Sequence, residues 1–132
     1  MSGAPKSLQI LVVDDDDVDR EQVQRLLARS GFDFQVTEAQ DADLALDLIG
    51  KGNFDCVLLD CHMPGMDGLD LVDQLARGSV PVLMISGRED AATATEALKR
   101  GVKGYLMKNN IRAHDLQQAI FRAVGNPAQI PL

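Results

Sequence analysis

The sequence predicts an α/β protein with a parallel sheet covered by helices on both faces. Short apolar runs alternate with amphipathic segments five times along the 132 residues, a pattern typical of β-α units wound around one sheet. Three of the runs are apolar at nearly every position, as expected for central strands buried on both sides. A chain of this length with 45% hydrophobic residues can fold around one core without disulfide or metal crosslinks. We therefore expect one three-layer, doubly wound domain.

The expected strands are short runs rich in branched apolar residues, and four of them stop at a polar residue. The second run is the weakest candidate because polar residues interrupt it. The runs cover residues 8–13, 34–39, 54–59, 81–85 and 105–107.

The expected helices carry apolar residues at helical spacing, and glycines close the first, second and fourth of them. These glycines are Gly31, Gly50 with Gly52, and Gly101. A turn-rich segment, MPGMDG at residues 63–68, precedes the third helix. The helices are expected at residues 18–29, 42–49, 69–76, 91–99 and 112–124.

The ends of the chain are expected to lie outside this domain. Residues 1–7 read as a polar N-terminal tail without the apolar core of a signal peptide. Residues 126–132 read as a C-terminal tail or the start of a linker, which leaves residues 8–125 as the domain.

Charge and composition narrow the classes of function. The net charge of −7 disfavours a nucleic-acid-binding surface and suits a partner that is a cation or a basic patch. The longest uncharged apolar stretch, residues 80–85, is too short to cross a bilayer. Cys56 and Cys61 lie five positions apart, which points them to opposite faces of a strand, so we expect reduced thiols in a cytoplasmic protein.

Polar residues directly follow four of the apolar runs. They are Asp14 with Asp15, Asp60, Ser86 and Lys108. The carboxyl ends of parallel strands meet at one edge of the sheet, where such folds bind ligands. Neighbouring carboxylates require a cation or protons between them, and oxygen ligands favour Mg²⁺, or Mn²⁺ in its place. The sequence therefore predicts a divalent-metal site at this edge.

The acidic run at residues 14–17 allows a second interpretation, because carboxylates also cap helix N-termini. We expect capping for Asp16 and Asp17, and metal binding for Asp14 and Asp15. A carboxylate beside Mg²⁺ is a workable nucleophile toward phosphorus, since the metal neutralises charge on the transferring group. Lys108 would then supply positive charge to a phosphoryl oxygen.

Four segments of the chain strongly resemble the response-regulator receiver family of two-component signalling. They are ILVVDDD at 10–16, VLLDCHMPGMDGLDL at 57–71, PVLMISG at 81–87 and GYLMK at 104–108. The resemblance extends over residues 8–124 and implies a flavodoxin-like (βα)5 fold with strand order 2-1-3-4-5.

The resemblance assigns a role to each residue of the expected metal site. Asp60 matches the phosphoacceptor, which takes a phosphoryl group from a histidine kinase, a histidine phosphotransfer protein or a small phosphodonor. Asp14 and Asp15 match the acidic pair, with Asp15 as the direct metal ligand and Asp14 acting mainly through water. The backbone carbonyl of His62 matches the third protein ligand.

The resemblance also implies a conformational switch. Ser86 matches the switch hydroxyl, Lys108 the lysine that contacts the phosphoryl group, and Tyr105 the aromatic residue that turns inward; Tyr105 could instead be an ordinary edge-strand aromatic. We expect an output domain or partner protein to bind the face formed by the helix at 91–99, Tyr105 and the last helix. The alanines of the helix at 91–99 could instead simply pack against the core. The chain is expected to catalyse only its own phosphorylation and slow dephosphorylation, and not to be an enzyme in the usual sense.

The residue after Lys108 departs from the family pattern, which often has proline there with a cis peptide bond. In this chain Asn109 and Asn110 follow. A cis bond before a residue other than proline costs about 2.5–4 kcal/mol, so we expect a trans Lys108–Asn109 peptide. We expect an asparagine in a left-handed turn to aim the lysine instead.

Two other functions fit parts of the sequence. The run DDDDV at 14–18 also satisfies the pattern of haloacid-dehalogenase-like phosphohydrolases, with Asp14 as nucleophile and Asp16 as acid/base. That family has further acidic metal ligands after the lysine, whereas here only Asp115 follows. The second alternative is a binding module that switches without phosphate, but such modules usually lack one of the key positions, all of which are present here.

Two residues at the rim of the expected pocket generate a prediction about phosphoryl lifetime. His62 lies two positions after Asp60, and Arg88 lies two after Ser86. If these bulky side chains obstruct an in-line water, His62→Ala and Arg88→Ala will each accelerate loss of the phosphoryl group, measured as decay of the acyl phosphate. Unchanged decay rates would mean that both side chains are merely solvated.

Overall fold

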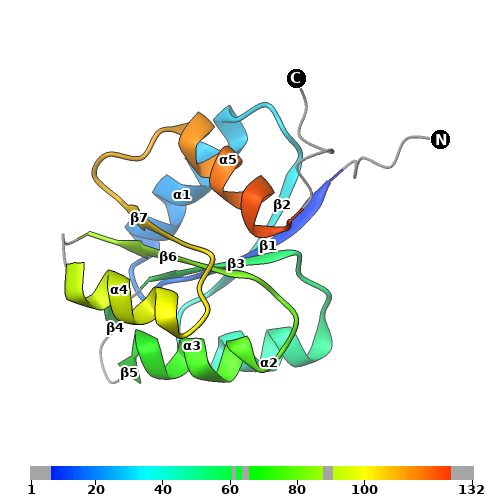
Figure 1. The fold of residues 1–132 in the computed structure, drawn as a ribbon. Coiled ribbons are helices and arrows are strands. Elements are labelled where there is room, and N and C mark those ends of the chain that lie inside the picture. Colours follow the sequence, from blue (N-terminus) through cyan, green and yellow to red (C-terminus); the bar gives the residue numbers. More distant parts are fainter. Residues whose placement is uncertain (1–6, 61, 64–65, 88–90, 126–132) are drawn as a thin grey trace.

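The computed structural model describes residues 7–60, 62–63, 66–87 and 91–125. Five parallel strands form one sheet in the order β2-β1-β3-β6-β7 (Figure 1). This order confirms the predicted flavodoxin-like (βα)5 architecture. The strands of the sheet are β1 Leu8–Val13, β2 Phe34–Ala39, β3 Cys56–Asp60, β6 Val82–Ser86 and β7 Gly104–Met107.

Helices cover both faces of this sheet and make the molecule three layers thick (Figure 1). One face carries α1 (Asp17–Arg29) and α5 (Ala113–Ala123), and the other carries the remaining three helices. Those three are α2 Ala42–Lys51, α3 Gly68–Ala76 and α4 Ala91–Lys99. None of the helices in the described part of the chain is long and apolar enough to cross a membrane.

The core is divided by the sheet into two clusters of buried side chains. Along β1, Ile10 and Val12 pack with α1 and α5, whereas Leu11 and Val13 pack with α2 and α3. Successive side chains of a strand point to opposite faces, so a strand covered on both sides must be apolar at every position. This double burial is the physical reason for the continuous apolar runs in the sequence.

Helix ends follow the polar and glycine signals with one difference. Asp16 is the N-cap of α1, as predicted, and accepts hydrogen bonds from the backbone nitrogens of Val18 (2.8 Å) and Asp19 (3.3 Å). Gly31, with φ of 86°, follows the end of α1. Of the two glycines predicted to end α2, Gly52 is its C-cap, whereas the prediction for Gly50 is wrong. The helix continues through Gly50 to Lys51, because glycine lowers helix propensity without blocking the backbone hydrogen bonds.

A short antiparallel ribbon precedes α3 and was not predicted. In it, β4 (His62–Met63) pairs with β5 (Met66–Asp67). Strands of two residues carry no periodicity that a sequence could reveal. The predictions made for Cys61, for Arg88, for the side chain of His62 and for both tails (residues 1–7, of which Ser7 alone is described, and 126–132) fall outside what the structure describes.

The two-sided core generates a prediction about stability. Leu116 of α5 is fully buried, whereas Leu98 of α4 is 52% exposed. Leu116→Ala is expected to lower the free energy of unfolding by about 2–5 kcal/mol, because it leaves a cavity. The same change at Leu98 should alter it by less than about 0.5 kcal/mol. Urea unfolding followed by circular dichroism measures both, and equal losses would contradict this placement of the core.

Candidate functional site

Polar residues from four strands meet at the carboxyl edge of the sheet. Asp14 directly follows β1, Asp60 ends β3, Ser86 ends β6 and Lys108 directly follows β7. Two backbone hydrogen bonds continue the strand pairing past the strand ends: the nitrogen of Asp14 donates to the carbonyl of Ala39 (3.1 Å), and that of Lys108 donates to the carbonyl of Ser86 (2.8 Å). The backbones that carry these side chains are therefore part of the sheet framework.

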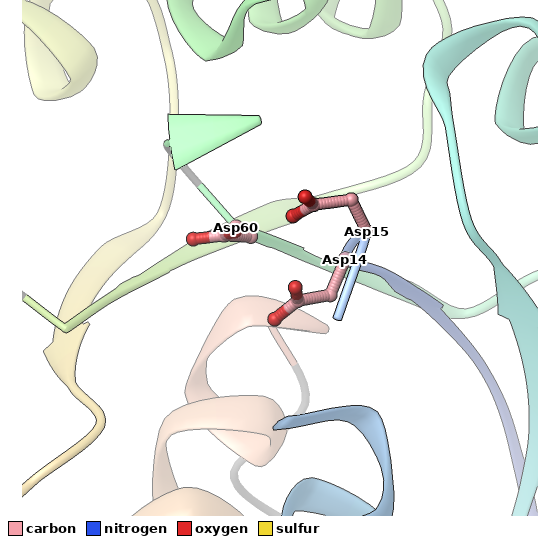
Figure 2. A group of neighbouring side chains, drawn as sticks. All are labelled: Asp14, Asp15 and Asp60. Atoms are coloured by element: carbon pink, nitrogen blue, oxygen red, sulfur yellow. The ribbon is translucent and has the colours of Figure 1, made fainter. Parts of the chain in front are cut away.

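Three carboxylates cluster at this edge. Asp14, Asp15 and Asp60 each offer a carboxylate oxygen, and these oxygens lie within 4.8 Å of one another. Figure 2 shows Asp14 and Asp15, which follow β1, beside Asp60 at the end of β3. Asp14 (3% exposed) and Asp60 (6%) are buried, whereas Asp15 is exposed. The cluster is thus open to solvent on the side of Asp15.

The ammonium group of Lys108 balances part of this negative charge. Its Nζ lies 2.8 Å from Oδ2 of Asp14, 2.8 Å from Oδ2 of Asp19 and 3.5 Å from Oδ1 of Asp60. Burial alone lowers the pKa of Lys108, but the hydrogen bonds to Asp14 and Asp19 and the attraction of Asp60 outweigh burial and raise this pKa above its ordinary value. Lys108 is therefore a permanent cation at physiological pH.

Two residues of this site, Asp19 and Arg20, were missed by the sequence analysis. Arg20 donates from Nη1 to the backbone carbonyl of Asp14 (2.6 Å) and from Nε to Oε1 of Glu38 (2.9 Å). It therefore ties the first turn of α1 to the chain after β1 and to β2. The N-cap at Asp16 was enough to predict that Asp19 lies in the first turn of a helix. Its contact with Lys108 joins positions 89 residues apart, and no local sequence pattern predicts such a contact.

The chemistry of the donor set fits a hard divalent cation. The three clustered carboxylates supply oxygen donors only, which Mg²⁺ and Mn²⁺ prefer. The single ammonium of Lys108 is shared among Asp14, Asp19 and Asp60, so negative charge remains in excess. The carbonyl of His62 belongs to β4, and its assignment as a further ligand remains a prediction.

The segment after Lys108 agrees with one expectation and contradicts another. The Lys108–Asn109 peptide is trans, as predicted, since no cis bond occurs among the described residues. The expected left-handed asparagine is wrong, because glycine alone has positive φ in the described part of the chain. The nitrogen of Asn110 instead donates to the carbonyl of Met107 (3.3 Å), and the ion pairs of Lys108 hold its side chain.

The two expected switch residues lie on neighbouring strands. Ser86 is fully buried at the end of β6, next to β7 in the sheet. Tyr105 of β7 is half-buried and packs against the core cluster on the α4 side of the sheet. Their roles in a switch remain predictions.

Comparison with known proteins identifies the class of this domain. The family model for the response regulator receiver domain matches residues 10–121. The chain therefore belongs to the response regulator receiver family, and is a domain of phosphorelay signalling.

Relatives in this family include short and long proteins. The chain is 39% identical over 107 residues to the chemotaxis protein CheY-3 of Vibrio cholerae serotype O1, covering 78% of this chain and 82% of that protein. It is 35% identical over 129 residues to the probable transcriptional regulatory protein NarL of Mycobacterium tuberculosis, covering 96% of this chain and 60% of that protein.

Solved structures agree with this assignment. The signal receiver domain of the putative response regulator NarL from Mycobacterium tuberculosis matches with a TM-score of 0.77 and 34% identity, covering 92% of this chain and 99% of that one. The signal receiver domain of an HD domain-containing protein from Pseudomonas fluorescens matches with a TM-score of 0.81 and 26% identity, covering 94% and 99%.

The acidic cluster generates a prediction about metal binding. Mg²⁺ that binds only the folded chain should stabilise it by about 2.7 kcal/mol at roughly 100 times its Kd. Asp15→Asn should abolish most of this gain, because it removes one of the three clustered carboxylates. Thermal unfolding with and without Mg²⁺ measures the effect, with Asp43→Asn, an exposed carboxylate on α2, as the control. A full Mg²⁺ effect in Asp15→Asn would exclude Asp15 as a ligand.

Proposed function

We propose that this domain accepts a phosphoryl group on Asp60 from a histidine kinase or a histidine phosphotransfer protein, with Mg²⁺ held by Asp14, Asp15 and Asp60. One observation carries the proposal. The buried carboxylate of Asp60 lies beside two further carboxylates, with the Lys108 ammonium 3.5 Å away. A nucleophile, donors for a metal and a cation for a phosphoryl group thus meet at one edge of the sheet.

The chemical step is a transfer between two nucleophiles. A carboxylate oxygen of Asp60 attacks phosphorus, an O–P bond forms, and the N–P bond to the imidazole of the donor breaks. Bound Mg²⁺ would neutralise charge on the transferring group. Lys108 moves from Asp14 toward a phosphoryl oxygen, which is a short displacement because its ammonium already lies near Asp60.

The phosphoryl group then biases an equilibrium between inactive and active conformations. Ser86 donates its hydroxyl to one phosphoryl oxygen, Lys108 contacts another, and Tyr105 turns inward as the hydroxyl moves. Each charge-assisted hydrogen bond contributes roughly 1.5–3 kcal/mol, so one weak bond would shift the populations about tenfold and two strong ones about ten-thousandfold. The role is that of a switch whose only catalysis is its own phosphorylation and slow dephosphorylation.

The partner that recognises the active conformation is proposed to bind at α4, β7 and α5. Leu98 projects from α4 with half of its surface exposed, and Tyr105 lies on the adjacent strand. The partner is either a separate protein or, as the greater length of NarL suggests, a domain of the same chain. A cytoplasmic location remains a prediction, and the buried free thiol of Cys56 is compatible with it.

A phosphorylation assay tests the proposed function. Acetyl phosphate and Mg²⁺ should add one phosphoryl group to the wild-type chain, seen by intact mass, and hydroxylamine should remove it. Asp60→Asn should abolish the gain because the nucleophile is lost, whereas Asp47→Asn, an exposed residue of α2, should leave it unchanged. Absence of any gain in the wild type would favour a binding module. Phosphorylation that persists in Asp60→Asn would place the nucleophile elsewhere, as in the phosphohydrolase alternative.

A further inference from the structure

Asp19 is an acidic neighbour of the site to which the family resemblance gives no role. It lies in the first turn of α1, and its Oδ2 is 2.8 Å from Nζ of Lys108, the same distance as Oδ2 of Asp14. The two carboxylates therefore share one ammonium from different elements. The side chain of Asp14 is 4% exposed and that of Asp19 is 32% exposed.

This sharing matters because Lys108 and a divalent cation need the same carboxylates. Asp14 and Asp60 belong to the acidic cluster, and both also face the ammonium of Lys108. A cation that takes Asp14 and Asp60 removes the negative charge that now holds Lys108 and adds positive charge beside it. The side chain of Lys108 is only 15% exposed, so the displaced ammonium requires another anionic partner close by.

Asp19 is placed to be that partner. Its contact with Lys108 exists already, so the ammonium can keep one ion pair while it gives up Asp14. The N-cap Asp16 fixes the backbone of Asp19 by accepting a hydrogen bond from its nitrogen (3.3 Å). Asp19 itself is outside the group of three carboxylates that could hold a metal.

We propose that Asp19 is a positioning residue that holds the Lys108 ammonium on the α1 side of the site when a divalent cation takes Asp14. The inference rests on the proposed metal-dependent function and adds a residue to it. Without Asp19, the ion-pair partners that the described residues leave to Lys108 are Asp14 and Asp60, so the ammonium competes harder with the cation. Asp19 thus supports metal binding without being a ligand.

The test is Mg²⁺ binding to the full chain, measured by isothermal titration calorimetry. Asp19→Asn should raise the Kd about three- to tenfold, a range that reflects the partial exposure of Asp19. Asp17→Asn is the matched control, because it removes the same charge from an exposed residue of the same helical turn. The change in Kd caused by Asp17→Asn measures the effect of losing one negative charge near the site. Circular dichroism verifies that each variant is folded.

A double-mutant cycle separates positioning from general charge. In a Lys108→Met background, Asp19→Asn should raise the Kd no more than Asp17→Asn does, because the group it positions is gone. Equal effects of Asp19→Asn and Asp17→Asn in the wild-type background would overturn the inference. An equally large rise in Kd on Asp19→Asn in the Lys108→Met background would also overturn the inference. If the wild-type chain binds no Mg²⁺, the proposed function fails and the inference fails with it, an outcome distinct from the other two.

Discussion

The ion pairs of Lys108 are the interaction on which the rest of the site depends. Two buried carboxylates lie at the carboxyl ends of neighbouring strands, Asp14 directly after β1 and Asp60 as the last residue of β3. Burying such charges is costly unless a cation accompanies them. The ammonium of Lys108 reaches both from β7, two strands beyond β3. The protein thus holds the carboxylate of Asp60 in a buried position with its own counter-ion.

Hydrophobic burial in the body of the parallel sheet offsets the cost of concentrating charge at its edge. Its strands carry apolar residues on both faces, so two hydrophobic clusters stabilise the framework independently of the site. Polar residues gather where the strands end, and the ladder hydrogen bonds of Asp14 and Lys108 hold their backbones in place. Stability therefore comes from the apolar body of the sheet, and the buried charges are confined to its carboxyl edge.

Much of the fold and part of the site could be predicted, for different reasons. Residues 8–13 form a strand because a sheet covered on both faces requires continuous apolar residues, and the convergence of Asp14, Asp60 and Lys108 follows from strand direction alone. The contact of Asp19 with Lys108 depends on how the first turn of α1 faces the chain after β7, which no local pattern encodes. The conformation of the Asn109 segment was mispredicted because the ion pairs of Lys108, and no special backbone geometry, aim its side chain.

The contacts of Arg20 have a mechanical consequence. By bonding the carbonyl of Asp14 and the carboxylate of Glu38, this residue joins α1, the end of β1 and β2 into a single block. On the opposite side, the backbone bond between Lys108 and Ser86 joins β6 to β7. Asp60 on β3 lies between these two blocks. Because β3 pairs with β1 on one side and with β6 on the other, Asp60 lies on the strand that joins the two blocks, and a force on its carboxylate acts on both of them at once.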